Sequence, residues 1–168
     1  MTKLIMILWL LSGLISCASA SRDKLGKIEN TEEMLDLAEA SASPGGRKVL
    51  EASRSMISNQ ELHVGGCWNY INAVYDRAGY QSKQRETVYK SKFNGPYVKS
   101  DVIQTGDWLY FVNHSFSESE HSAIFVAWID EDKKEALMVN YVGGNKKKPG
   151  TYKRFILDEV YNVFRAQD

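Results

Sequence analysis

Residues 121–142 read HSAIFVAWIDEDKKEALMVNYV. Residues 121–129 and 135–142 are mostly apolar and rich in β-branched and aromatic side chains, and a short charged turn separates them. Two apolar runs of this length joined by a short polar turn are typical of an antiparallel β-hairpin. Similar runs lie on both sides of this hairpin, at 108–112, 151–156 and 160–165. The sequence therefore predicts five consecutive strands with short connections.

The residues before these strands show a different period. Three segments have apolar side chains at helical spacing and are predicted helices: 31–40, 47–58 and 67–78. A break at 41–46, containing Pro44-Gly45-Gly46, separates the first two, and residues 80–106 are predicted to be mostly irregular. Helices followed by a run of strands predict an α+β fold, with N-terminal helices packed on a five-stranded antiparallel sheet.

Composition and charge exclude several classes of protein. The chain has 168 residues, 43% of them hydrophobic, and 21 basic residues balance 21 acidic ones. This hydrophobic content is enough for a packed core, so extensive disorder is excluded. A neutral chain lacks the basic excess needed to bind phosphate backbones, so nucleic acid is excluded as the main partner. The cysteines and histidines show no zinc-ligand spacing, and the sequence predicts neither a metal nor a cofactor.

Residues 1–20 have the features of a secretory signal: a basic residue near the start, an apolar core at 4–15, and small residues at the end. That core is too short to span a bilayer, which needs about 20 residues. Ala18-Ser19-Ala20 fits signal-peptidase cleavage, whereas Leu14-Ile15-Ser16-Cys17 resembles a bacterial lipoprotein box in which Cys17 would carry lipid. We expect an exported bacterial protein, either free in the periplasm or anchored to the membrane through lipid on Cys17.

Cys67 is the cysteine that remains after removal of residues 1–20, and it follows Gly65-Gly66 at a predicted helix start. The unpaired N–H groups and the dipole of a helix N-terminus favour a thiolate over a thiol. The glycines permit a tight turn, and the Cys67 N–H would point toward an oxyanion formed by attack on a carbonyl. The simplest alternative is a buried cysteine without a chemical role. The position makes Cys67 a candidate nucleophile that needs a base.

His121 is the candidate base because it opens the best predicted strand, where a rigid element would hold its side chain. His114 lies in a polar segment that reads as an exposed loop. His63 precedes Cys67 by four residues in the same predicted loop, where it could contact the thiol or line a cleft.

The register of the hairpin predicts a partner for His121. If Ile129 pairs with Lys134, His121 lies opposite Val142, and Asn140 is its diagonal neighbour on the same face. If the turn is two residues shorter, His121 lies directly opposite Asn140. Both registers place the amide where it could hold the imidazole, whereas a slip of one residue would separate them.

Three segments in this order resemble a known superfamily. They are Gly66-Cys67-Trp68-Asn69-Tyr70 at a helix start, Gly106-Asp107-Trp108-Leu109-Tyr110-Phe111 on a strand, and His121-Ser122-Ala123-Ile124-Phe125-Val126 on the next strand. Together they resemble the NlpC/P60 and CHAP branches of the papain-like cysteine peptidases and amidases, over about residues 47–165. The resemblance implies a papain-like cysteine hydrolase domain at 47–168, after a tether and short helix at 21–46.

The resemblance also implies roles for individual residues. Cys67 would be the nucleophile, His121 the base and Asn140 the orienting third residue. Gln60 and His63 are candidates for the side-chain donor to the oxyanion, and Trp68 is a candidate to line the cleft. In place of the Asp-Cys-Ser/Thr pattern common in NlpC/P60 proteins, this chain has Gly66-Cys67-Trp68.

The expected function is that of an exported thiol hydrolase that cleaves amide bonds by Cys-His-Asn acyl transfer. The expected substrate is peptidoglycan, cleaved in its stem peptides by an endopeptidase or amidase activity, or another peptide. Three alternatives stay open. The first is an inert papain-like module that binds cell-wall peptides or a protein partner, and the second is an enzyme that acts on a different acyl substrate. The third is a structural lipoprotein without a site.

Overall fold

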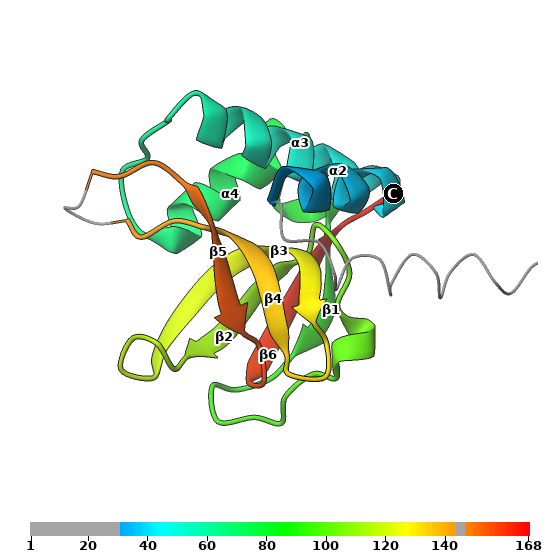
Figure 1. Cartoon of the computed structure of the whole chain (residues 1–168), viewed down its shortest axis with the longest axis vertical. Coiled ribbons are helices and arrows are strands. Elements are labelled where there is room, and N and C mark those ends of the chain that lie inside the picture. Colours follow the sequence, from blue (N-terminus) through cyan, green and yellow to red (C-terminus); the bar gives the residue numbers. More distant parts are fainter. Residues whose placement is uncertain (1–30, 144–146) are drawn as a thin grey trace, which may run out of the picture.

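The computed structural model describes residues 31–143 and 147–168 and has the predicted α+β fold (Figure 1). The elements of the described chain are α2 (Thr31–Ser41), α3 (Pro44–Ser58), α4 (Cys67–Arg77), β1 (Arg85–Lys90), β2 (Trp108–Asn113), β3 (Ser119–Asp130), β4 (Glu135–Asn140), β5 (Thr151–Ile156) and β6 (Val160–Ala166). Two short 3₁₀ helices, η1 (Ser82–Gln84) and η2 (Ser100–Val102), lie in the connections on either side of β1.

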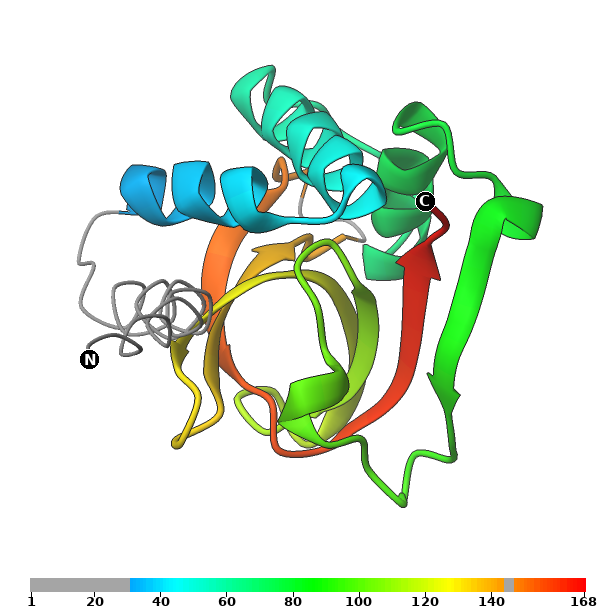
Figure 2. The same cartoon turned by 90° about the vertical axis from the view of Figure 1, so that its right-hand side faces the viewer.

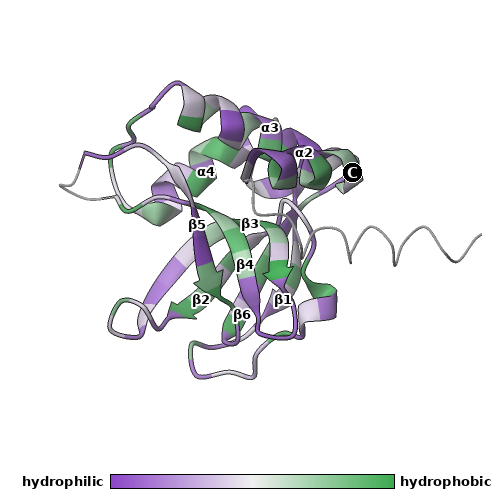
Figure 3. Cartoon of the chain, viewed as in Figure 1, coloured by the Kyte–Doolittle hydropathy of each residue, from purple (hydrophilic) through white to green (hydrophobic). Residues whose placement is uncertain are grey.

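The six strands form one antiparallel sheet in the order β1-β6-β2-β3-β4-β5. The sheet curls strongly and the three helices gather on one side of it (Figure 2). Successive strand residues point to opposite faces, so Ile124 belongs to the core between sheet and helices, and Phe125 to a second core inside the curl. Apolar residues accordingly follow the strands and the sheet-facing sides of the helices (Figure 3).

The prediction of five strands is wrong, because Arg85–Lys90 forms a sixth strand within the segment predicted to be irregular. This strand, β1, lies at the edge of the sheet and pairs with β6. It carries charged residues and none of its side chains is fully buried. Edge strands are commonly charged in this way because the charges oppose aggregation. The segment therefore lacked the apolar alternation by which strands are recognised in a sequence.

The helix predicted to start at residue 47 begins at Pro44, so the predicted break at Pro44-Gly45-Gly46 is its first turn. Ser43 caps this turn by accepting a hydrogen bond from the Gly46 N–H at 3.1 Å, and proline is well tolerated in the first turn of a helix. A methyl group on Gly46 would overlap the carbonyl oxygen of Thr105. Gly46 is therefore needed because the helix packs closely against the chain before β2, and it does not mark a loop.

The turn between β3 and β4 differs from the prediction. The expected pairing of Ile129 with Lys134 is wrong, since Asp130 pairs with Glu135. Lys134 has a φ of +59°, which is the left-handed conformation of a tight turn. If the pairing at this turn continued unchanged along the hairpin, Asn140 would lie opposite a β3 residue that is too far from His121 for the two side chains to meet.

Two irregularities in β3 correct this distance. Each shifts the register by one residue, so that Ile124 pairs with Val139 at the end of the hairpin that carries His121. That end has the first of the two predicted registers, with Asn140 diagonal to His121. Because the shifts come in a pair, both side chains stay on the same face, and Asn140 moves about 7 Å along β3 toward His121.

The predicted signal segment, with Cys17 and the site after Ala20, lies outside the described residues. Among residues 31–143 and 147–168, no helix is long and apolar enough to cross a membrane. The first helix, α2, packs on α3 and β3 and contributes Met34, Leu35 and Ala38 to the core between helices and sheet.

Candidate active site

Cys67 is the first residue of α4, as the sequence predicts, and Gly66 is the N-cap. The Gly66 N–H donates to Asn69 Oδ1 at 3.0 Å, which fixes the entry of the chain into the helix. Gly65 has a φ of +108°, and a methyl group there would overlap the Asn69 amide. The local sequence thus holds the Cys67 thiol over a helix N-terminus through a turn that requires glycine at residue 65.

The chain that leaves β4 passes close to this turn. β4 ends at Asn140, two residues earlier than predicted, and Gly143 follows with a φ of +68°. A methyl group on Gly143 would lie 2.6 Å from the Cα of Gly66. Gly143 therefore lets the chain that leaves β4 approach the turn before Cys67 closely.

His121 and Asn140 meet as the sequence predicts. His121 Nε2 lies 2.8 Å from Asn140 Oδ1, and Asn140 is 4% exposed. The imidazole packs against the rings of Phe111 and Phe155, with both centroid distances 5.5 Å. A hydrogen bond to a carboxamide oxygen needs the proton on Nε2, so Nδ1 of the neutral ring is left to accept a proton.

The Cys67 thiol is partly buried and interacts with the same imidazole. Burial alone would raise the pKa of this thiol, but hydrogen bonds with His121 and Ser122 outweigh it and lower the pKa to about 7. A large part of the thiol is therefore ionised at neutral pH, and the thiolate is the state in which cysteine is nucleophilic. The structure brings together Cys67, His121 and Asn140, the three residues predicted from the sequence.

Sequence reasoning missed Ser122, whose hydroxyl and backbone N–H both favour the thiolate form of Cys67 and so lower the pKa of the thiol. Ser122 directly follows His121 on β3, and adjacent strand residues point to opposite faces. Only the placement of α4 over the sheet shows that both can reach one sulfur.

Trp68, predicted to line a cleft, is 49% exposed beside the nucleophile. Its ring packs 5.8 Å from that of Trp108, and its interaction with Tyr110 partly opposes the rise in the pKa of that tyrosine. Burial raises the pKa of Tyr110 to about 12, so its hydroxyl stays protonated at neutral pH. Charge on Cys67 raises the pKa of Tyr110 further, an electrostatic link that sequence reasoning did not identify.

The two predicted oxyanion donors are placed differently. Gln60 is exposed, with a φ of +52°. The backbone of His63 exchanges two hydrogen bonds with the Tyr141 hydroxyl, at 3.0 and 2.6 Å, and its ring packs edge-on against Tyr70. Among the contacts of the described residues, none joins Gln60 or His63 to the Cys67 sulfur.

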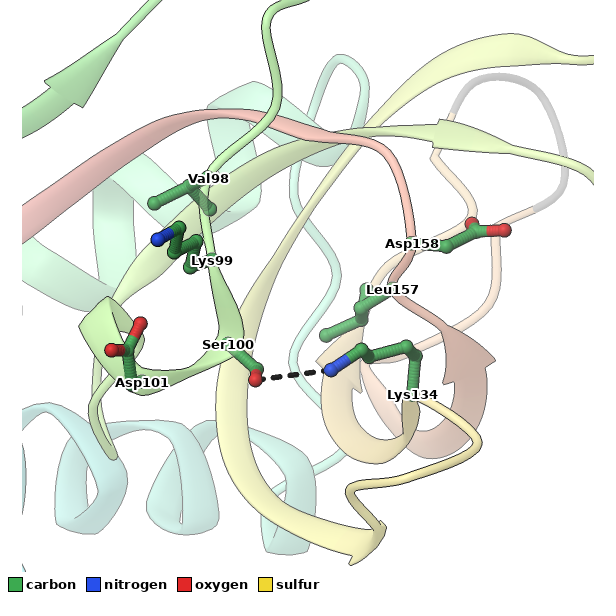
Figure 4. Close-up of a pocket in the computed structure, with 7 residues that line it drawn as sticks. All are labelled: Val98, Lys99, Ser100, Asp101, Lys134, Leu157 and Asp158. Carbon is green, nitrogen blue, oxygen red and sulfur yellow. Dashed lines mark hydrogen bonds between the residues drawn. The ribbon is translucent and has the colours of Figure 1, made fainter.

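A cavity of about 400 Å³ lies apart from these residues (Figure 4). It is lined by Val98, Lys99, Ser100, Asp101, Lys134, Leu157 and Asp158. Lys134 crosses it and donates to Ser100 Oγ at 3.0 Å. None of the candidate site residues contributes to this cavity. In the described part of the chain, no group of three or more His, Cys, Asp and Glu side chains could hold a metal ion.

No protein-family model and no curated protein matches the chain. Among solved structures, it is similar to the crystal structure of a wild-type endolysin, LysIME-EF1, with 12% sequence identity and a TM-score of 0.43. The similar region covers 72% of this chain and 63% of the endolysin chain. We therefore interpret the site from its own geometry.

Proposed function

We propose that this chain is a thiol hydrolase of the papain-like class that cleaves amide bonds. Cys67 is the nucleophile, His121 the base, and Asn140 the residue that orients the base. The observation that carries the proposal is the 2.8 Å hydrogen bond between His121 Nε2 and Asn140 Oδ1, on a ring that also interacts with the thiol. A buried amide, an imidazole and a thiol in this order have the three roles that acyl transfer requires.

The reaction follows from the positions of the protons. His121 Nδ1 takes the proton of Cys67, and the thiolate attacks the carbonyl carbon to form a C–S bond. The free N–H groups at the start of α4, including that of Cys67, stabilise the oxyanion. His121 then gives its proton to the leaving amine as the C–N bond breaks. Water attacks the thioester while His121 takes a proton from it, the C–S bond breaks, and the electron pair returns to the sulfur.

The order of the elements supports a relation to the NlpC/P60 and CHAP branches: a cysteine at a helix start, followed by an antiparallel sheet that carries the histidine and the asparagine. We propose an amide bond of peptidoglycan stem peptides as the substrate, and export as residues 1–20 predict, with lipid on Cys17 or cleavage after Ala20. Trp68, Val64 and Val142, which are 49%, 95% and 49% exposed, would contact the substrate around the nucleophile.

Digestion of purified sacculi tests this proposal. Wild-type protein and Cys67→Ala are incubated with the same sacculi, and the released fragments are identified by mass spectrometry. We expect new stem-peptide termini with wild type alone, because the variant lacks the nucleophile but keeps the binding surface. No fragments with wild type, or the same fragments with both proteins, would contradict the proposal. The intact mass of the mature protein distinguishes lipid on Cys17 from cleavage after Ala20.

The alternative is an inert papain-like module that binds wall peptides or a protein partner. The replacement of the usual Asp-Cys-Ser/Thr by Gly66-Cys67-Trp68 favours it, since side chains expected to hold a stem peptide are missing. This module would bind sacculi without releasing fragments. Its Cys67 would also alkylate no faster at neutral pH than an unperturbed cysteine.

A further inference from the structure

The hydroxyl of Ser122 is an unexplained polar group in the core. Ser122 is 2% exposed, and its Oγ has no hydrogen-bond partner of ordinary length and angle among the described residues. Burying a hydroxyl without a partner is unfavourable, because the group gives up its hydrogen bonds to water and gains none in return. A group that carries this cost either is an accident of packing or has a partner in another state of the protein.

The position of Ser122 identifies that partner. Ser122 and Ile124 are two residues apart on β3, so their side chains point to the same face of the sheet. The side chain of Ile124 belongs to the core between sheet and helices. α4 packs against β3 on this side. Cys67 is the first residue of α4 and is partly buried, so its sulfur lies at the helix that covers the Ser122 side of β3, and Ser122 favours the ionised form of this sulfur. A neutral thiol is a weak acceptor, whereas a thiolate is a strong one.

We propose that Ser122 is a further catalytic residue beside Cys67 and His121, whose hydroxyl gains its missing hydrogen bond when Cys67 becomes a thiolate. Ionisation of the sulfur then satisfies a buried donor that the thiol form leaves unpaired. The stability of the thiolate therefore depends on Ser122 as well as on His121. The catalytic consequence rests on the proposed hydrolase function. Ser122 would favour the thiolate both as the attacking group and as the group that leaves when the thioester breaks.

The experiment measures the ionisation of Cys67 without any substrate. The full chain and Ser122→Ala are alkylated with iodoacetamide between pH 5 and 9, and the rate at Cys67 is followed by peptide mass mapping. We expect Ser122→Ala to raise the apparent pKa of Cys67 by about one unit, which lowers the alkylation rate below pH 6 about tenfold. Ser53→Ala is the matched control, because Ser53 is also buried and donates to the Val49 carbonyl at 2.8 Å, within α3.

A second pair of variants separates Ser122 from His121. The apparent pKa is compared between His121→Ala and His121→Ala/Ser122→Ala, and we expect a further rise in the double variant. Ser122→Gly replaces Ser122→Ala if the alanine variant does not fold. An unchanged pKa on removal of the hydroxyl, in wild type and in His121→Ala, would overturn the proposal. A shift in pKa together with intact sacculi would support it while contradicting the hydrolase function.

Discussion

The residues of the site differ in how much their roles depend on their neighbours. Cys67 owes its position to its own segment, since Gly65, Gly66 and Asn69 build the turn that precedes it. His121 depends on a residue of another strand, because its tautomer is set by the hydrogen bond with Asn140. The reactivity of the Cys67 sulfur therefore depends on His121 and Asn140 as well as on Cys67 itself. Replacing one of these side chains at a time tests this dependence.

Ionisation of Cys67 is expected to control reactivity near neutral pH. Because its pKa is lowered to about 7, the alkylation rate should rise with pH and reach half its maximum near pH 7. His121→Ala removes a hydrogen bond and a favourable charge, so the midpoint should move up by about one unit or more. His114→Ala, which removes an exposed imidazole near Asp158 and Glu159, should leave the profile unchanged. A wild-type midpoint above pH 8.5 would contradict this prediction.

Asn140 is expected to affect turnover more than substrate binding. Asn140→Ala removes the hydrogen bond that orients His121, and the loss of one bond to a group that becomes charged corresponds to about a 10- to 100-fold fall in kcat. Steady-state kinetics on the fragments released from sacculi measure it. The control is Asn113→Ala, a buried amide at the end of β2 that accepts from Ser115. Equal losses in the two variants would show a general effect on folding instead.

At the scale of elements, the turn before α4 packs closely against two segments: Gly65 against Asn69 of the helix itself, and Gly66 against Gly143 after β4. Gly65 and Gly143 have positive φ and no room for a side chain, whereas Gly66 has open space around its Cβ position. Tyr75 fixes the rest of the helix to the sheet, because its hydroxyl donates to Gly106 and Phe164 carbonyls at 2.7 and 3.2 Å. The orientation of α4 over β3 thus depends on both ends of the helix.

Substitution of the glycines tests this arrangement. Gly65→Ala forces a side chain into a left-handed conformation and against Asn69, so we expect a loss of about 1–3 kcal/mol in the free energy of unfolding. Gly66→Ala should cost less, about 1 kcal/mol or below, because the added methyl group meets nothing and only the preference of the N-cap for glycine over alanine is lost. Denaturant unfolding of both variants provides the measurement. Equal stability would mean that the turn does not need its left-handed residue.

At the scale of the molecule, one buried ion pair ties the end of the chain to its middle. Arg165 on β6 donates from Nε and Nη2 to the two carboxylate oxygens of Asp107, both at 2.8 Å, and Nη2 also donates to the Val102 carbonyl at 2.9 Å. Asp107 is fully buried, and its Oδ2 accepts from the Gln104 N–H. The aspartate of the Gly-Asp strand therefore holds the curled sheet together at the start of β2.

Loss of this pair is expected to destabilise the whole protein. Arg165→Met leaves the Asp107 carboxylate buried without its counter-ion, which costs about 3–5 kcal/mol. Burial raises the pKa of Asp107, and the bonds from Arg165 oppose that rise. The deficit should therefore shrink as the pH falls toward 4, because a protonated carboxyl leaves no buried charge. Arg154→Met, at an exposed arginine 3.5 Å from Glu135, is the control and should cost less than about 1 kcal/mol. A deficit in Arg165→Met that is no larger than this would contradict the prediction.

Sequence periodicity was sufficient to predict the fold class, the helix that begins at Cys67, and the shared face of His121 and Asn140. These features depend on local rules: helical spacing, glycine at turns, and the alternation of strand side chains with a period of two. An even number of register shifts preserves that alternation, so the prediction of a shared face survived a wrong turn.

The tertiary structure alone decided the remaining features. The edge strand β1 is charged and has no apolar alternation, and it became a strand through pairing with β6, which is about 75 residues away in the sequence. The two irregularities in β3 bring Asn140 within reach of His121, and the packing of α4 on β3 lets Ser122 influence the ionisation of Cys67. Such features depend on contacts between distant segments, and the local order of residues does not encode which segments will meet.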